Sequence, residues 1–153
     1  MVNRKFGLGI LALALVFGMM AIACDDGSSN GGGSGGRTDS ALNGTWVAPG
    51  ERLTLNNGDF EIFEFGTLMV RGTYTTSGNS MTIRINQISG AMFGLPGLQS
   101  RSDLSNALSG LLPASELNMV LDEIFSPMTG TYTLSGNTLT ITMQGETTEY
   151  TRN

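Results

Sequence analysis

The 153-residue sequence predicts a mainly β fold, an eight-stranded antiparallel up-and-down β-barrel with a helical insert between the fifth and sixth strands. Three observations lead to this prediction. Residues 72–85 return as residues 130–143 with nine of fourteen positions identical. Each copy alternates apolar and polar residues on both sides of a Ser-Gly-Asn turn, which is the pattern of a β-hairpin. Further alternating segments bring the count to eight short strands, which fit a barrel or, as second choice, a sandwich.

The elements before the first hairpin are three short strands. Residues 42–48 and residues 52–56 alternate apolar and polar positions, and residues 59–65 are rich in aromatic side chains. The third strand changes its apolar face, because Phe60 and Ile62 lie on one side and the aromatic residues after them on the other. A bulge near Ile62 would explain this change, and a strand that is apolar on both faces is the alternative.

The two hairpins and the last strand, residues 146–152, each present one apolar face. The residues expected to face the barrel interior are Leu68, Val70, Tyr74, Met81, Ile83, Ile85, Tyr132, Leu134, Leu139, Ile141, Met143 and Tyr150. Their opposite faces carry mainly threonine and arginine, which are expected to meet water. A closed barrel leaves no strand edge exposed, which favours it over the sandwich.

The one long connection runs through residues 88–127 and is predicted to be a helical hairpin. Residues 102–110 can form a short helix, and Pro113 suits the first position of a second helix. The second helix carries an apolar stripe at i, i+3, i+4 and i+7, made of Leu117, Val120, Leu121 and Ile124. The barrel mouth, the outer wall or another protein could bury this stripe. We expect a lid over the mouth, because the threonine-rich wall offers little apolar surface.

The N-terminus has the layout of an export signal. Arg4 and Lys5 precede a charge-free stretch over residues 6–23, which ends in small residues directly before Cys24, the only cysteine. The stretch Ala-Ile-Ala-Cys resembles the lipobox of bacterial lipoproteins, with Ala21 where leucine is usual. A plain signal peptide cut after the last alanine and an uncleaved membrane anchor are the alternatives.

The lipobox resemblance implies that residues 1–23 are a signal peptide and that Cys24 carries fatty acyl chains such as palmitate. It implies anchoring in the bacterial cell envelope, with the outer membrane favoured. Residues 24–39 are mostly glycine, serine and polar side chains and are expected to form a flexible tether. Residues 40–153 are expected to form the barrel domain with its insert.

The charge balance excludes some classes of partner. From Cys24 onward the sequence has six arginines and no lysine against thirteen acidic residues, a net charge of −7. Nucleic-acid binding depends on basic contacts to phosphates, so no nucleic-acid partner is expected. A polybasic hold on anionic lipids is disfavoured for the same reason.

The chain offers little for catalysis. It has no histidine, which removes Ser-His-Asp and Cys-His catalysis and the commonest metal ligand. Its carboxylates are scattered: Glu61 and Glu64 are expected on opposite faces of one strand, and Asp122 and Glu123 on the polar side of a helix. We therefore expect no enzyme, no metal and no cofactor.

The ends of the predicted domain resemble the lipocalin and calycin families. Gly44 and Trp46 match the Gly-x-Trp motif of their first strand, and Arg152 matches the arginine near the end of their last strand. In lipocalins these side chains close one end of the barrel, so the resemblance implies a cation–π pair worth about 0.5–2 kcal/mol. A Thr-Asp-Tyr signature is missing, and the chain is most similar to small lipocalin-like domains of bacterial lipoproteins.

Two functions are compatible with this reading. By analogy of fold, the barrel would bind a small apolar ligand at its mouth, and the residues expected to contact it are Leu68, Tyr74, Tyr132, Tyr150, Leu117 and Leu121. The alternative is an interaction protein with a filled barrel, whose insert contacts a partner protein of the envelope. A largely apolar cavity above about 300 Å³ would favour the first. Exposed Met92, Phe93 and Leu95 without such a cavity would favour the second.

Overall fold

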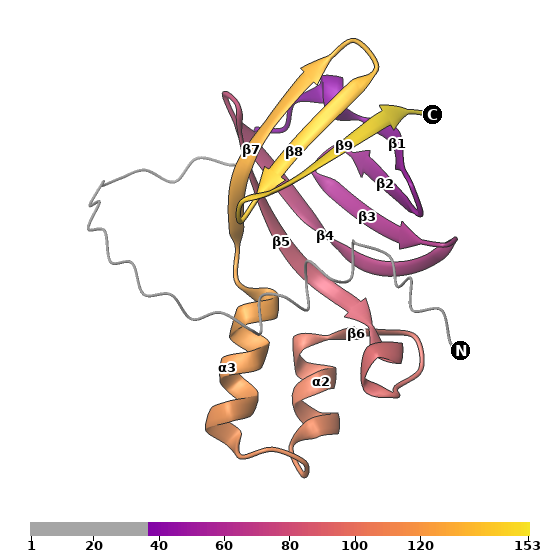
Figure 1. The fold of residues 1–153 in the computed structure, drawn as a ribbon. Helices are drawn as coiled ribbons and strands as arrows, with labels where there is room; N and C mark the ends of the chain where they lie inside the picture. The colour runs from indigo at the N-terminus through magenta and orange to yellow at the C-terminus, as the bar shows by residue number, and fades with distance from the viewer. Residues whose placement is uncertain (1–36) are drawn as a thin grey trace, which may run out of the picture. The chain divides into compact units, whose positions relative to one another are not determined.

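The computed structural model describes residues 37–153 (Figure 1). The predicted signal peptide, Cys24 and the predicted tether up to residue 36 lie outside the described residues. Contacts of the folded part already begin at Arg37, whose carbonyl accepts a hydrogen bond from the Thr76 amide at 2.7 Å. The last residues assigned to the tether therefore contact the barrel.

Nine strands follow one another in this part of the chain. They are β1 (Gly44–Ala48), β2 (Glu51–Asn56), β3 (Asp59–Glu64), β4 (Thr67–Ser77), β5 (Ser80–Ser89), β6 (Leu98–Ser100), β7 (Met128–Ser135), β8 (Thr138–Met143) and β9 (Glu146–Arg152). The helices are two 3-10 turns, η1 (Ser40–Leu42) and η2 (Gly90–Phe93), and two α-helices, α2 (Arg101–Leu108) and α3 (Ala114–Phe125).

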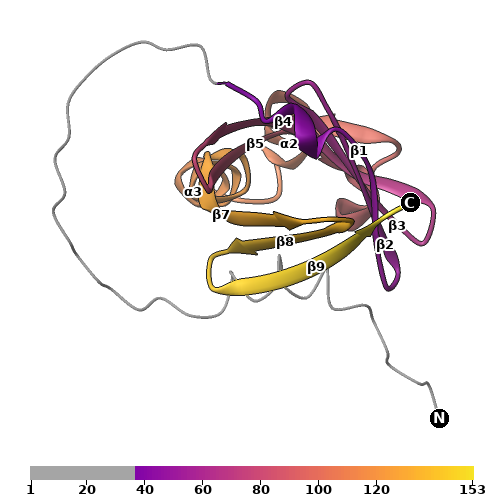
Figure 2. The ribbon, with the colours of Figure 1, turned by 90° about the horizontal axis from the view of Figure 1, so that it is seen from above.

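Eight of the strands close into an antiparallel barrel, which confirms the predicted fold class. The order around the barrel is β4-β3-β2-β1-β9-β8-β7-β5, and β4 also pairs with β5. Most neighbours are hairpins. The ring is completed by the first and last strands, where Trp46 lies opposite Arg152. Figure 2 views this ring from above, with β1 to β3 on one side and β7 to β9 on another.

The duplicated hairpin keeps a glycine where neighbouring backbones come close. A Cβ atom on Gly72 would lie 2.2 Å from the carbonyl oxygen of Arg84, and one on Gly130 would lie 2.1 Å from that of Thr142. Real Cβ atoms do not approach a backbone oxygen so closely. The two glycines therefore let each strand approach its neighbour rather than leave room inside the barrel.

A register shift lies between Ile62 and Phe63, where the sequence predicts a bulge. The extra residue belongs to the facing strand, because Ile62 pairs with Val70 and Phe63 pairs with Leu68, which leaves Met69 over. Cross-strand partners share a face, so Leu68 lies on the side of Phe63 and not on the side of Val70. The expectation that Leu68 faces inward does not hold.

The insert lies between β5 and β7 as predicted, but its first part differs from the sequence prediction. β5 continues through Ile88 to Ser89, and β6 adds a ninth strand on the free edge of β5. Two α-helices follow, and α3 begins at Ala114, one residue after Pro113. Three residues of the predicted stripe are buried and one, Val120, is half-buried.

The helices pack on one side of the barrel end. In Figure 1, η1 lies at one end of the barrel, which we call the closed end. The helices α2 and α3 extend beyond the other end, which we call the helical end. α3 contacts α2 and β5, and Figure 2 shows it beside β5 and β7, away from β2 and β3. The insert therefore covers one side of the mouth instead of spanning it as a lid.

Candidate functional site

The closed end of the barrel is sealed by η1 and by the residues that resemble the lipocalin motif. Trp46 is fully buried, and its Nε1–H donates to the carbonyl of Leu42 at 2.8 Å. The Arg152 guanidinium lies 4.4 Å from the tryptophan ring centroid and donates to the carbonyl of Ala41 at 2.6 Å. Gly44 has a φ of +142° and would bring a Cβ within 3.7 Å of this guanidinium. These contacts close this end of the barrel.

Two of the three tyrosines point their hydroxyls at this closed end. Tyr74 donates to Asn43 Oδ1 at 3.3 Å, and Tyr132 donates to Asp39 Oδ2 at 3.1 Å. Burial raises the pKa of both hydroxyls, and the carboxylate of Asp39 adds to the rise in the pKa of Tyr132. Both tyrosines therefore stay protonated and act as hydrogen-bond donors that hold the N-terminal segment on the barrel.

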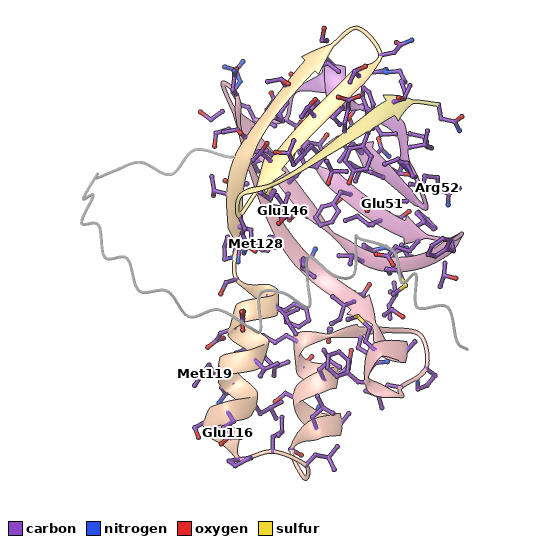
Figure 3. All side chains as sticks on the ribbon, viewed as in Figure 1. Glu51, Arg52, Glu116, Met119, Met128 and Glu146 are labelled. Carbon is purple, nitrogen blue, oxygen red and sulfur yellow. The ribbon has the colours of Figure 1, made fainter. Side chains whose placement is uncertain are left out.

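The helical end carries inward carboxylates. The hydroxyl of Tyr150 donates to Glu51 Oε1, and Glu51 lies directly opposite Glu64 in the β2–β3 register. Burial, the charge of Glu51 and the hydrogen bond raise the pKa of Tyr150 well above its usual value. Partial burial and the same Glu51 charge raise the pKa of Glu64. Figure 3 shows Glu51 on this part of the barrel wall. Like charges directly opposite each other destabilise a strand pair.

Replacing Glu64 by glutamine is therefore expected to stabilise the fold at neutral pH by about 0.2–1 kcal/mol. Because the folded-state pKa of Glu64 is raised, its ionised form costs stability above that pKa, and the cost is lost as the pH falls below the ordinary glutamate pKa. Urea unfolding at pH 7 and pH 3.5 measures this difference. Glu146→Gln, at an exposed position, is the control, and an equal gain from both variants would refute the Glu51–Glu64 repulsion.

The interior between the two ends is filled with side chains. The large apolar residues of the barrel strands that are at most 8 % exposed are Trp46, Leu53, Leu55, Phe60, Val70, Tyr74, Met81, Ile85, Ile88, Tyr132, Leu139 and Tyr150. An eight-stranded barrel encloses just enough space for such side chains or for one small ligand. Here large side chains take up that space.

The six residues expected to contact a ligand do not form one site. Tyr74, Tyr132 and Tyr150 are core side chains whose hydroxyls are used at opposite ends of the barrel. Leu117 and Leu121 are buried in the hairpin of α2 and α3. The sixth residue, Leu68, lies on the Phe63 side of β4.

The helical insert exposes apolar side chains that the sequence prediction did not single out. Leu111 and Leu112, in the turn between α2 and α3, are 75 % and 39 % exposed, and Met119 on α3 is 60 % exposed. We call these three residues the hairpin tip. Figure 3 shows Met119 and Glu116 on the side of α3 away from α2. Of the residues proposed from the sequence, Met92 is exposed, but Phe93 and Leu95 are half-buried against the core.

One signal in the sequence could have revealed the hairpin tip. Met119 falls outside the i, i+3, i+4, i+7 stripe of α3, so it had to lie on another face of the helix. Leu111 and Leu112 stand directly before Pro113, between the two predicted helices, so neither residue belongs to the apolar face of a helix. Apolar residues at such positions are left to solvent unless another surface buries them.

Residues 37–153 do not bring together three or more His, Cys, Asp or Glu side chains in a geometry that could hold a metal ion. No helix within the same residues is long and apolar enough to cross a bilayer. Comparison with protein-family models, with curated proteins and with solved structures gives no match for this chain.

Proposed function

We propose that this protein is a non-catalytic interaction module of the bacterial cell envelope, anchored through an acylated Cys24, and that its hairpin tip binds another protein. The barrel is then a filled scaffold of lipocalin-like type. One observation carries the proposal. The apolar residues of the hairpin tip are exposed on a projecting pair of helices, while the barrel interior is occupied by its own side chains.

The hairpin tip has the chemistry of a protein interface. Large apolar side chains left exposed on a projecting pair of helices are typical of surfaces that bind a protein or a membrane. The two helices bear one basic residue and four acidic residues, which are Arg101, Asp103, Glu116, Asp122 and Glu123. An acidic rim is repelled by anionic lipid headgroups, so a bilayer surface is a poor partner. A protein that combines an apolar patch with flanking basic residues is the complementary partner.

The path of the chain supports the same assignment. Arg37 and Asp39 contact β4 and β7 through hydrogen bonds to Thr76 and Tyr132, at the closed end of the barrel. The helices extend from the opposite end (Figure 1). A chain anchored through Cys24 would reach the barrel at the closed end, which leaves the hairpin tip available to a partner.

A photo-reactive amino acid in place of Met119 tests the interface in intact cells. We expect one discrete cross-linked adduct, which Leu111→Ser in the same chain should strongly reduce because it removes apolar contact area. The same photo-reactive group in place of Thr133, exposed on the outer face of β7, is the matched control and should give no such adduct. Equal adducts from both positions, or none from Met119, would overturn the proposed interface.

The anchor is checked in the same cells by fatty-acid labelling. The wild-type chain should take up label and stay with the membranes, whereas Cys24→Ser should lose both, since the acyl acceptor is gone. Label on Cys24→Ser would contradict the lipid anchor. It would not contradict the proposed interface at the hairpin tip.

A second candidate function, binding of a small apolar ligand, is favoured by a different observation. Several inner residues of the strands are only partly buried against the core, namely Ala48, Ile62, Ile141 and Met143. A ligand at the helical end of the barrel would cover them. A dye that fluoresces in apolar surroundings separates the two functions: under the second, its binding is unchanged by Leu111→Ser.

A further inference from the structure

A pocket of about 590 Å³ opens on the outer wall of the barrel, at the place where β5 changes its neighbour. Residues 80–83 of β5 pair with β7, and residues 87–89 pair with β6 on the same edge. Neither strand pairs with residues 84–86 between them. The start of α2 and Phe125 at the end of α3 form the other walls.

A β-bulge shapes the floor of this pocket. Arg71 pairs with Gln87 and Gly72 pairs with Ile85, so Asn86 is an extra residue of β5. Asn86 is exposed and lines the pocket. Bulges re-aim side chains and are common next to functional sites. Here the bulge coincides with the stretch of β5 that lacks a partner on this edge.

The side chains that line the pocket are hydrogen-bond donors or apolar. They include two arginines, two asparagines and three serines, beside Ile85 and Phe125. Residues 37–153 contain six arginines and eleven acidic residues, and two of the arginines but none of the acidic residues line this pocket. Two carboxylates stand just outside the lining, Asp103 bound by Ser100 and Asp122 bound by Arg101. An anion in the pocket therefore needs a lining cation that neither carboxylate neutralises.

Arg84 supplies the available charge. The other arginine, Arg101, is paired with Asp122 through one of its terminal nitrogens. The start of α2 already carries a negative charge, because Asp103 caps it: its carboxylate accepts hydrogen bonds from the amide and the hydroxyl of Ser100, and its amide donates to Ser100 Oγ. Within residues 37–153, Arg84 makes no ion pair. The pocket therefore depends on the Arg84 side chain and not on the amide groups of the helix.

We propose that this pocket binds the phosphate group of a small hydroxylated molecule. The planar guanidinium of Arg84 can hold two phosphate oxygens at once. Asn86, Ser105 and Asn106 can bind hydroxyl groups and the remaining oxygen, and Phe125 provides an apolar wall. A phosphate monoester has three terminal oxygens and a phosphodiester has two, and the monoester can accept hydrogen bonds from more of these donors than a carboxylate can. The pocket is wide open to solvent, so a bound molecule would be held by these contacts and not by enclosure.

The proposed phosphate site is separate from the hairpin tip and does not depend on the function proposed for it. The same chemistry has two sources, a soluble phosphorylated polyol or the headgroup of a phospholipid. Glycerol 3-phosphate and a short-chain, water-soluble phosphatidylglycerol represent these two sources. Binding of each to the full-length chain is measured by isothermal titration calorimetry.

We expect saturable binding of at least one of the two compounds. Arg84→Gln should weaken it at least tenfold, which corresponds to about 1.4 kcal/mol. Arg52→Gln removes the same charge from an exposed arginine of β2 and should change the affinity less than twofold, because Arg52 does not line the pocket and, like Arg84, makes no ion pair within residues 37–153. If Arg84→Gln lowers the melting temperature, Asn86→Ala replaces it, with weaker binding again expected.

Each outcome bears on the proposal. Binding of glycerol 3-phosphate identifies a soluble ligand, and binding of phosphatidylglycerol alone identifies a headgroup. Absence of saturable binding for both compounds overturns the proposal. Equal weakening by Arg84→Gln and Arg52→Gln also overturns it, because the effect would then come from net charge alone.

Discussion

Replacing Trp46 by alanine is expected to lower the free energy of unfolding by about 3–5 kcal/mol. The ring is fully buried at the closed end, so its removal leaves a cavity between Leu42 and Arg152. The change also leaves the carbonyl of Leu42 without its indole donor. A loss of this size is a large part of the 5–15 kcal/mol that stabilises a typical domain.

Urea unfolding followed by circular dichroism measures this loss, since Trp46 is the only tryptophan and the variant has no indole fluorescence. Leu111→Ala removes a large apolar side chain that is 75 % exposed and serves as the control. It should change the unfolding free energy by less than about 0.5 kcal/mol. Equal losses in the two variants would show that the ring has no structural role at this end of the barrel.

Gly130→Ala is expected to cost about 3 kcal/mol, at the upper end of the range for overpacked sites. The new methyl group would lie 2.1 Å from the carbonyl oxygen of Thr142, and a backbone atom cannot move aside by changing a rotamer. Gly72→Ala should act in the same direction, because its Cβ would lie 2.2 Å from the carbonyl oxygen of Arg84.

Gly110→Ala is the matched control for these two variants. Nothing lies within 4 Å of a Cβ at this position, and its φ is not in the positive range. It should be neutral or stabilise the fold by about 0.4–1 kcal/mol, since alanine restricts the unfolded chain. Trp46 fluorescence in urea follows all three variants. A neutral Gly130→Ala would show that the two strands can separate without loss.

The local sequence pattern is sufficient to predict the fold, because the strands alternate apolar and polar residues and the turns contain characteristic residues. The hairpins of residues 72–85 and 130–143 were predicted from side-chain period and from Gly-Asn pairs, and both are present. The three residues of β6 are too few to show a period. The sequence places Leu68 on the wrong face, because the extra residue, Met69, lies in an apolar run that fits either face.

The sites were harder to predict, because they depend on which surfaces remain uncovered. Burial of Leu117 and exposure of Met119 follow from the place where α3 packs, and sequence period indicates only that they differ. The phosphate pocket combines residues of β5, α2 and α3 with no common motif. In the sequence, Arg84 stands between apolar residues, as any outward-facing strand residue does. Only its place in the stretch of β5 that pairs with neither β7 nor β6 distinguishes it from the others.

The pairing of β1 with β9 has a consequence for the order of folding. Arg152 donates to the carbonyl of Ala41, which lies 111 positions earlier in the chain. Contacts over such a separation form late, because the entropy of closing the intervening loop is lost before they contribute. A chain that emerges N-terminus first therefore has to hold β1 as an open edge until its last residues appear. The nascent protein is most exposed to mispairing with other chains during that interval.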